Sequence, residues 1–175
     1  MGVTTVSLMP LATCADELRL IKLNLRNYWG YSPISWMAPH HAYQQGDDPL
    51  QIRHQVRQLV TACHQAGLEV LVDVVYNHTS DAGPNSPFGA PAPYYFFRTT
   101  PAGRFTNDSG TGNGFADERP MARKYILDSL EHWLRHYRVD GFRFDLLGTH
   151  RAETVRAICD RVKSIRPDAT LYGEP

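Results

Sequence analysis

Residues 137–145 read Tyr-Arg-Val-Asp-Gly-Phe-Arg-Phe-Asp. Apolar and polar residues alternate here, and three apolar side chains suit a short buried strand: Val139, Phe142 and Phe144. Arg143 and Asp145 are two residues apart, so both are expected on the same face of that strand. A cation beside a carboxylate favours its ionised form, which a carboxylate nucleophile requires. The stretch therefore predicts either a catalytic carboxylate at a strand end or a structural ion pair beneath a loop.

Strands and helices alternate on both sides of this stretch. Strands are predicted over 3–8, 68–75, 139–145 and 169–173, and helices over 49–66, 118–137 and 151–165. The strand at 68–75 is apolar on nearly both faces, as in a parallel sheet covered by helices. The order predicts an α/β fold with right-handed crossovers. By itself it leaves open a (β/α)8 barrel and a doubly wound sheet.

The predicted helices have apolar faces and recognisable ends. Asp48 is the expected N-cap of the first, with Pro49 at its first helical position. Residues 15–25 suit a short helix or an ordered loop. Residues 79–117 lack periodicity, which predicts a long functional excursion from the sheet. The inward faces are expected to hold Ile52, Val56, Leu59, Val60 and Cys63; then Ile126, Leu130, Trp133, Leu134 and Tyr137; and then Val155, Ile158, Cys159, Val162 and Ile165.

Composition excludes several classes of function. The 175 residues are enough for one core, and 42% hydrophobic with 21% charged residues indicates a globular protein. Lys+Arg and Asp+Glu both number 18 and no basic run stands out, so no nucleic-acid partner is expected. No apolar run reaches the roughly 20 residues of a membrane span, and no signal peptide is visible. A cytoplasmic protein is expected, although a truncated N-terminus would hide an export signal.

The three cysteines are odd in number and far apart along the chain. This spacing predicts small buried thiols at Cys63 and Cys159 and neither a disulfide framework nor a metal site.

Polar residues gather directly after the predicted strands. Asp73 and Asn77-His78 follow the second, Arg143 and Asp145 the third, and Glu174 the fourth. Active sites are built at this edge in both parallel architectures. Two carboxylates on neighbouring strands, which lie about 4.8 Å apart, can provide the nucleophile and acid of a retaining glycosidase.

The residues at these strand ends resemble those of a known family. Three segments are similar to the first three conserved regions of the α-amylase superfamily, glycoside hydrolase family 13: 73–78 (Asp-Val-Val-Tyr-Asn-His), 141–145 (Gly-Phe-Arg-Phe-Asp) and 172–174 (Tyr-Gly-Glu). Tyr28-Trp29-Gly30-Tyr31 resembles α-1,6 debranching enzymes. Segments 105–110, 118–121 and 128–130 resemble type I pullulanases, and the N-terminal third equally resembles isoamylase-type glycogen debranching enzymes.

The resemblance implies roles for individual residues. Asp145 would be the nucleophile, Glu174 the acid and then base, and Arg143 would orient Asp145. His78 would hydrogen-bond the sugar and Tyr31 would stack on it. A further residue, Asp73, would be mainly structural, as a tie to Arg143. No cofactor is assigned, and calcium, which Asn77 binds in many relatives, stays unassigned. His150 would line the leaving-group side or lie in solvent at a helix start.

The length departs from that of the family. A (β/α)8 barrel needs about 250 residues, whereas residues 1–175 supply four strands, which the resemblance places as strands 2–5 with the excursion 79–117 after strand 3. The third acidic residue of the family belongs to strand 7. The chain is therefore interpreted as a fragment of a catalytic barrel, inactive alone.

Three functions are weighed on this basis. The first is hydrolysis of α-1,6 linkages in pullulan, glycogen or starch-type α-glucans. The second is a non-catalytic glucan-binding or remnant barrel, which the intact Asp145 and Glu174 disfavour. The third is α-glucan transfer of the branching type, which Trp29-Gly30-Tyr31 disfavours.

Overall fold

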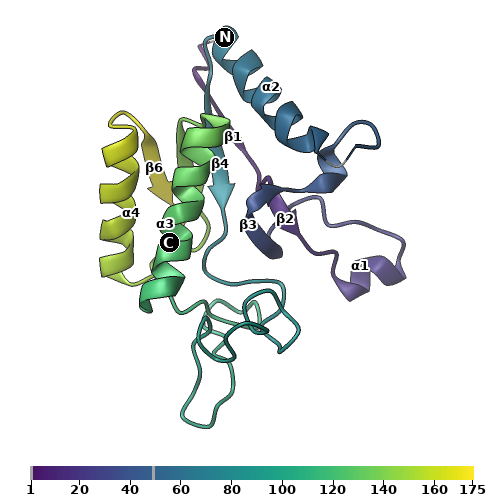
Figure 1. Ribbon diagram of the computed structural model, residues 1–175, viewed down its shortest axis with the longest axis vertical. Helices are drawn as coiled ribbons and strands as arrows, with labels where there is room; N and C mark the ends of the chain where they lie inside the picture. Colours follow the sequence, from purple (N-terminus) through teal and green to yellow (C-terminus); the bar gives the residue numbers. More distant parts are fainter. Residues whose placement is uncertain (1, 49) are drawn as a thin grey trace.

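A computed structural model describes residues 2–48 and 50–175 and contains a four-stranded parallel sheet (Figure 1). Its order is β1-β4-β5-β6, so the strands of this sheet lie side by side in the order in which they occur along the chain. A doubly wound sheet would reverse this order at a switch point, whereas a barrel keeps it. The strands are β1 (Thr5–Leu8), β4 (Glu69–Val74), β5 (Gly141–Phe144) and β6 (Thr170–Gly173).

Helices connect the strands as predicted. They are α2 (Gln51–Gln65) between β1 and β4, α3 (Pro120–His132) before β5, and α4 (Ala152–Ile165) before β6. A π-helical turn, η2 (Trp133–Tyr137), extends α3, and a 3-10 turn, η3 (Leu147–Thr149), follows β5. Residues 79–117, which the structure describes in full, form neither helix nor named strand.

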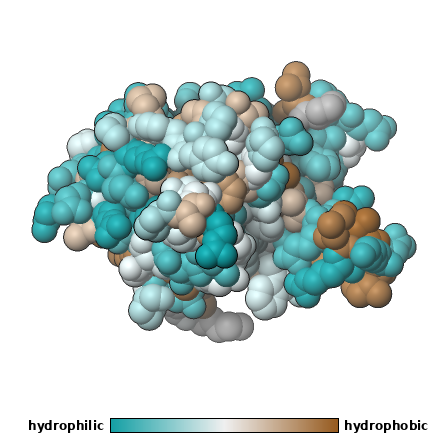
Figure 2. Space-filling view, turned by 90° about the horizontal axis from the view of Figure 1, so that it is seen from below, coloured by the Kyte–Doolittle hydropathy of each residue, from teal (hydrophilic) through white to brown (hydrophobic). Residues whose placement is uncertain are grey.

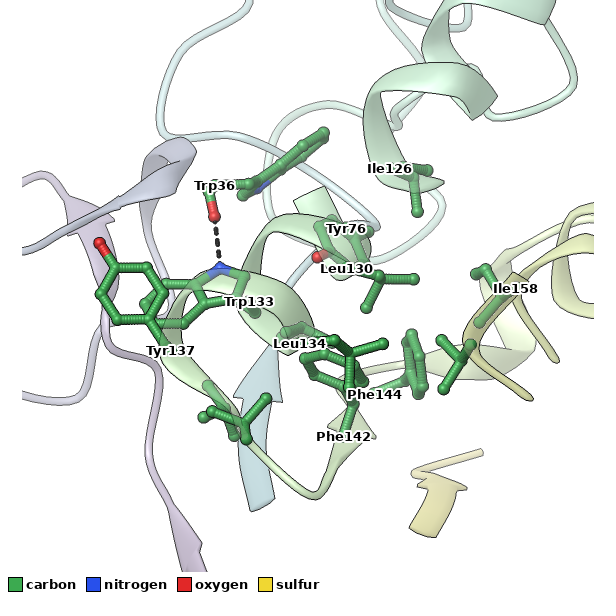
Figure 3. Close-up of a cluster of buried hydrophobic side chains, with 14 of the residues drawn as sticks. Trp36, Tyr76, Ile126, Leu130, Trp133, Leu134, Tyr137, Phe142, Phe144 and Ile158 are labelled. Carbon is green, nitrogen blue, oxygen red and sulfur yellow. Dashed lines mark hydrogen bonds between the residues drawn. The ribbon is translucent and has the colours of Figure 1, made fainter. Parts of the chain in front are cut away.

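The core lies between the sheet and these helices (Figure 3). All five predicted inward residues from Ile126 to Tyr137 are buried, and the Trp133 indole N–H donates to the Trp36 carbonyl at 2.7 Å. Two predictions on the other helices are wrong, because Leu59 and Cys159 are exposed. On each helix the apolar face is wider than the part that packs against the rest of the protein, and these two residues lie at its uncovered edge.

The N-terminal segment contains a hairpin that the sequence pattern did not indicate. Strands β2 (Ala12–Cys14) and β3 (Pro33–Pro39) pair antiparallel, with register shifts between the pairs. Prolines at both ends of β3 and only three residues in β2 obscure the strand pattern. Between them, the predicted helix is only α1 (Leu18–Lys22), none of whose residues is buried. A 3-10 turn, η1 (His41–Tyr43), follows.

The start of α2 also differs from the prediction. Its N-cap is Leu50, two residues after the predicted Asp48. The Asp48 carboxylate instead accepts the Leu50 N–H at 3.0 Å, and the Asp48 carbonyl accepts the Gln51 N–H at 3.0 Å. Pro49 lies outside the described residues.

Gly141 is required where β5 meets β6. A Cβ at this position would lie 1.9 Å from the Thr170 carbonyl oxygen. Gly141→Ala must therefore separate two paired strands, and we expect a loss of about 1–3 kcal/mol or more in the free energy of unfolding. Urea denaturation measures it. Gly2→Ala, whose Cβ would have no neighbour within 4 Å, is the control; equal stability of the two variants would contradict the prediction.

Candidate active site

One guanidinium, that of Arg143, contacts three carboxylates at the carboxyl edge of the sheet. Its nitrogens lie 2.7 Å from Asp73, 3.4 Å from Asp145 and 2.5 Å from Glu174. The acids come from the ends of β4, β5 and β6. They meet at Arg143 because Arg143 is in register with Asp73 on one strand and with Tyr172, two residues before Glu174, on the other. The structure therefore brings the predicted nucleophile and acid to one face of the sheet.

Asp73 is the most buried of the three acids. Its Oδ2 accepts the Tyr31 hydroxyl at 2.5 Å as well as Arg143, whereas its buried Oδ1 has no partner among the described residues. Burial raises the pKa of Asp73 above its usual value, although both donors stabilise the carboxylate. These contacts provide the tie between β4 and Arg143 that the sequence predicted.

Asn77 holds Asp145 in place. Its side-chain amide donates to the Asp145 carbonyl at 3.0 Å and to the Asp145 carboxylate at 2.9 Å. Leu146 then adopts a left-handed conformation with φ of 45°, so the chain turns away directly after the carboxylate. Sequence reasoning missed this role of Asn77. Its position directly after a strand was the available signal.

His78 is buried beside Asn77. Its Nδ1 lies against Oδ1 of Asn77, and its Nε2 lies 3.0 Å from the Tyr31 carbonyl. Both ring nitrogens thus face groups of this chain, and sugar binding by His78 stays a prediction. The same holds for stacking by Tyr31, whose half-buried ring is fixed through its hydroxyl on Asp73.

Burial lowers the pKa of three histidines, His40, His78 and His132, below the ordinary 6.5. The unfolded chain then binds more protons than the folded chain as pH falls through 6.5, so the free energy of unfolding decreases in that direction. Asp73 acts oppositely through its raised pKa, but it is one group against three. Urea denaturation at about pH 7.5 and about pH 5.5 measures the change. His132→Gln should show a smaller loss, and unchanged stability of the parent chain would refute the prediction.

A second buried cluster holds the far end of the loop that begins at Asp145. The fully buried Asp117 carboxylate accepts from Arg98, from the Arg151 N–H at 2.9 Å, and lies 3.2 Å from Nδ1 of His150. Burial alone would raise the pKa of Asp117, but the hydrogen bonds of His150 and Arg151 outweigh it and lower this pKa. Asp117 thereby fixes the backbone of Arg151, the residue that precedes α4, a helix without a side-chain cap. The predicted alternative that His150 lies in solvent at a helix start is wrong, because the His150 ring is buried.

The residues that the structure describes contain no group of three or more His, Cys, Asp and Glu side chains arranged to hold a metal ion. Within the same residues, no helix has the length and apolar character needed to cross a membrane.

Comparison with known proteins reveals close relatives, although no protein-family model matches. Pullulanase of Bacillus subtilis is 41% identical over 175 residues, covering 99% of this chain and 24% of that protein. Glycogen debranching enzyme of Erwinia tasmaniensis is 39% identical over 176 residues, covering 98% of this chain and 25% of that protein. The crystal structure of pullulanase type I from Bacillus subtilis complexed with maltose matches with a TM-score of 0.90 and 39% identity, over 99% of this chain and 24% of that chain.

These matches, together with the strand order, define a partial α/β barrel similar to the corresponding part of type I pullulanase. More particularly, the chain is a homologue of pullulanases and glycogen debranching enzymes, which confirms the resemblance drawn from the motifs. It spans about a quarter of the length of the relatives that it matches.

Proposed function

We propose that this chain carries the catalytic carboxylates of an enzyme that hydrolyses α-1,6-glucosidic branch linkages in pullulan, glycogen or starch-type α-glucans. The observation that supports this most is the shared contact of Asp145 and Glu174 with Arg143 on one face of the sheet. Relatives named pullulanase and glycogen debranching enzyme support the choice of linkage.

The proposed reaction is a retaining hydrolysis in two steps. Asp145 attacks the anomeric carbon and forms a glycosyl-enzyme ester while Glu174 gives a proton to the leaving glycosidic oxygen. Glu174 then takes a proton from water, which attacks the same carbon and releases Asp145. Arg143 and the Asn77 amide contact the Asp145 carboxylate and hold it in place. His78 and Tyr31 would bind the sugar beside them.

Residues 1–175 alone are proposed to be inactive. The resemblance assigns a third acidic residue of the site to a strand beyond the four described here, and transition-state stabilisation depends on every group aimed at the developing charge. A test of function must therefore supply the rest of the barrel.

A chimera provides that test. Residues 1–175 replace the matching quarter of Bacillus subtilis pullulanase, which is 41% identical to them. The expected result is release of maltotriose from pullulan by the chimera, and none by residues 1–175 alone. A chimera that has the circular dichroism of the parent pullulanase but lengthens or branches glucans would identify a transferase. One that only binds pullulan would identify a non-catalytic barrel.

A further inference from the structure

Four basic side chains from two helical segments converge on one tyrosine ring. Arg53 and Arg57 are four residues apart on α2, and His132 and His136 are four residues apart where α3 continues into η2, so each pair lies on one face of its helix. The two imidazole centroids are 4.7 Å apart, and the His132 ring lies 5.5 Å from that of Tyr137. The guanidinium carbon of Arg57 lies 5.7 Å from the same Tyr137 ring. These four residues form a basic cluster.

Arg57 is held in place with most of its donors free. Its Nε donates to the His136 carbonyl at 2.8 Å, and its guanidinium lies over the Tyr137 ring. Its two terminal nitrogens have no hydrogen-bond partner among the residues that the structure describes. A guanidinium fixed in this way loses little entropy on binding, and its paired N–H groups match the oxygens of a phosphate.

No carboxylate balances the basic cluster. Within the described part of the chain, none of its four members forms an ion pair with Asp or Glu, whereas Arg135 of the same turn pairs with Glu131 at 2.6 Å. Burial lowers the pKa of His132, and the positive charges of the other three members lower it further. The charges of the cluster therefore repel one another, and a bound anion would relieve that repulsion.

The composition of the basic cluster favours a small anion over a metal ion or a polyanion. Two histidines four residues apart on a helix are a common zinc pair, but Arg53 and Arg57 would repel a dication. Arginine and imidazole N–H groups can all donate to the oxygens of one phosphate. The chain has zero net charge and no basic run, which a nucleic acid or another polyanion would need.

The basic cluster and the carboxylate edge lie at opposite ends of the sheet. Tyr137 precedes β5, whereas Asp145 follows it. Figure 3 shows the Tyr137 hydroxyl turned away from the other labelled side chains. In Figure 1 the strands run downward from this end, and Figure 2 looks at the opposite end, where hydrophilic and hydrophobic residues are interspersed. A ligand at the basic cluster would therefore leave Asp145 accessible.

We propose that the basic cluster binds a phosphate group, either free phosphate or that of a small phosphomonoester, between α2 and η2. The terminal nitrogens of Arg57 donate to two phosphate oxygens, and Arg53 and the imidazole N–H of His136 donate to the others. The inference does not depend on the proposed function, since it uses neither the carboxylates nor a glucan.

Calorimetric titration of residues 1–175 with inorganic phosphate tests the proposal, and glycerol 3-phosphate in a second titration distinguishes an esterified phosphate from a free one. Saturable binding with a Kd of about 1 mM or lower is expected for at least one of them. Arg57→Gln is expected to raise that Kd about tenfold or more, as loss of a hydrogen bond between charged groups does. Because Arg57 also contacts Tyr137, the exposed Arg53→Gln is the second variant, with the same direction of change.

The matched control is Arg104→Gln, an exposed arginine of segment 79–117, which should leave the Kd unchanged. The proposal is overturned if neither phosphate compound binds, or if Arg53→Gln and Arg57→Gln both bind as tightly as the parent chain. An equal loss in Arg104→Gln would also overturn it, because attraction would then depend on total charge alone.

Two further probes cover the other ligands. If Ni²⁺ binds, His136→Ala abolishes that binding, and phosphate does not bind, the basic cluster is a cation site and the proposal is wrong. Binding of heparin without binding of either phosphate compound would likewise replace the small anion by a polyanion. None of these results bears on the pullulan assay of the chimera, which tests the proposed function separately.

Discussion

Replacing Asp145 by Asn in the chimera is expected to lower kcat on pullulan by a factor on the order of 10⁴ or more, as removal of a nucleophile does in other covalent mechanisms. Asn keeps the shape of the side chain but cannot attack the anomeric carbon. Its amide also replaces an oxygen that accepts from Asn77 at 2.9 Å. Folding should persist, because Asp145 lies at the end of β5 and outside the hydrophobic core.

A second pair of variants distinguishes the nucleophile from the acid. Glu174→Gln should lose most activity on pullulan, whose leaving sugar needs a proton. Its kcat/KM should fall much less on an aryl α-maltotrioside, whose phenolate leaves unprotonated, because kcat/KM reports on formation of the glycosyl-enzyme and not on its hydrolysis, which still needs the base. Asp145→Asn should lose activity on both substrates, because both need the attacking carboxylate.

The matched control is Asp160→Asn, a carboxylate change on the exposed face of α4. It should leave kcat unchanged. If Asp145→Asn lowers kcat by less than about a hundredfold, the loss is smaller than even general acid–base assistance contributes. That result would remove Asp145 from the nucleophile's role.

The sequence predicted the sheet and its carboxylate edge because both depend on short-range periodicity. Arg143 and Asp145 share a face by the two-residue repeat of a strand. Glu174 falls next to them because β6 pairs in parallel with β5, which the strand and helix order already implied.

The features that sequence analysis missed depend on contacts between distant residues. Nothing local indicates that Asp117 would accept the Arg151 N–H and hold His150, since the partners are more than thirty residues apart. Exposure of Cys159 depends likewise on what covers α4, and its helical spacing cannot show that.

Arg143→Met is expected to lower the free energy of unfolding of residues 1–175 by about 3 kcal/mol, the lower end of the range for breaking a buried ion pair. The side chains of Arg143 and Asp73 are 19% and 6% exposed. Without the guanidinium, a buried Asp73 carboxylate keeps only Tyr31 as donor. Met fills a similar volume, so the loss reports on charge and not on a cavity.

The pH dependence of this loss identifies its cause. Burial already raises the pKa of Asp73, and removal of Arg143 raises it further. A carboxylate with a raised folded-state pKa contributes stability that is present below its unfolded-state pKa and is lost as pH increases. The Arg143→Met variant should therefore be more strongly destabilised at about pH 8 than at about pH 5.

Asp73→Asn, alone and combined with Arg143→Met, completes a double-mutant cycle. In the Arg143→Met background it should recover part of the loss and abolish its pH dependence. Arg135→Met is the control, because its pair with Glu131 lies on the helix surface with the Arg135 side chain 57% exposed. Such surface pairs contribute about 1 kcal/mol or less. A loss for Arg143→Met no larger than that of the control, and independent of pH, would show that the Asp73–Arg143 pair does not stabilise the edge on which Asp145 and Glu174 are held.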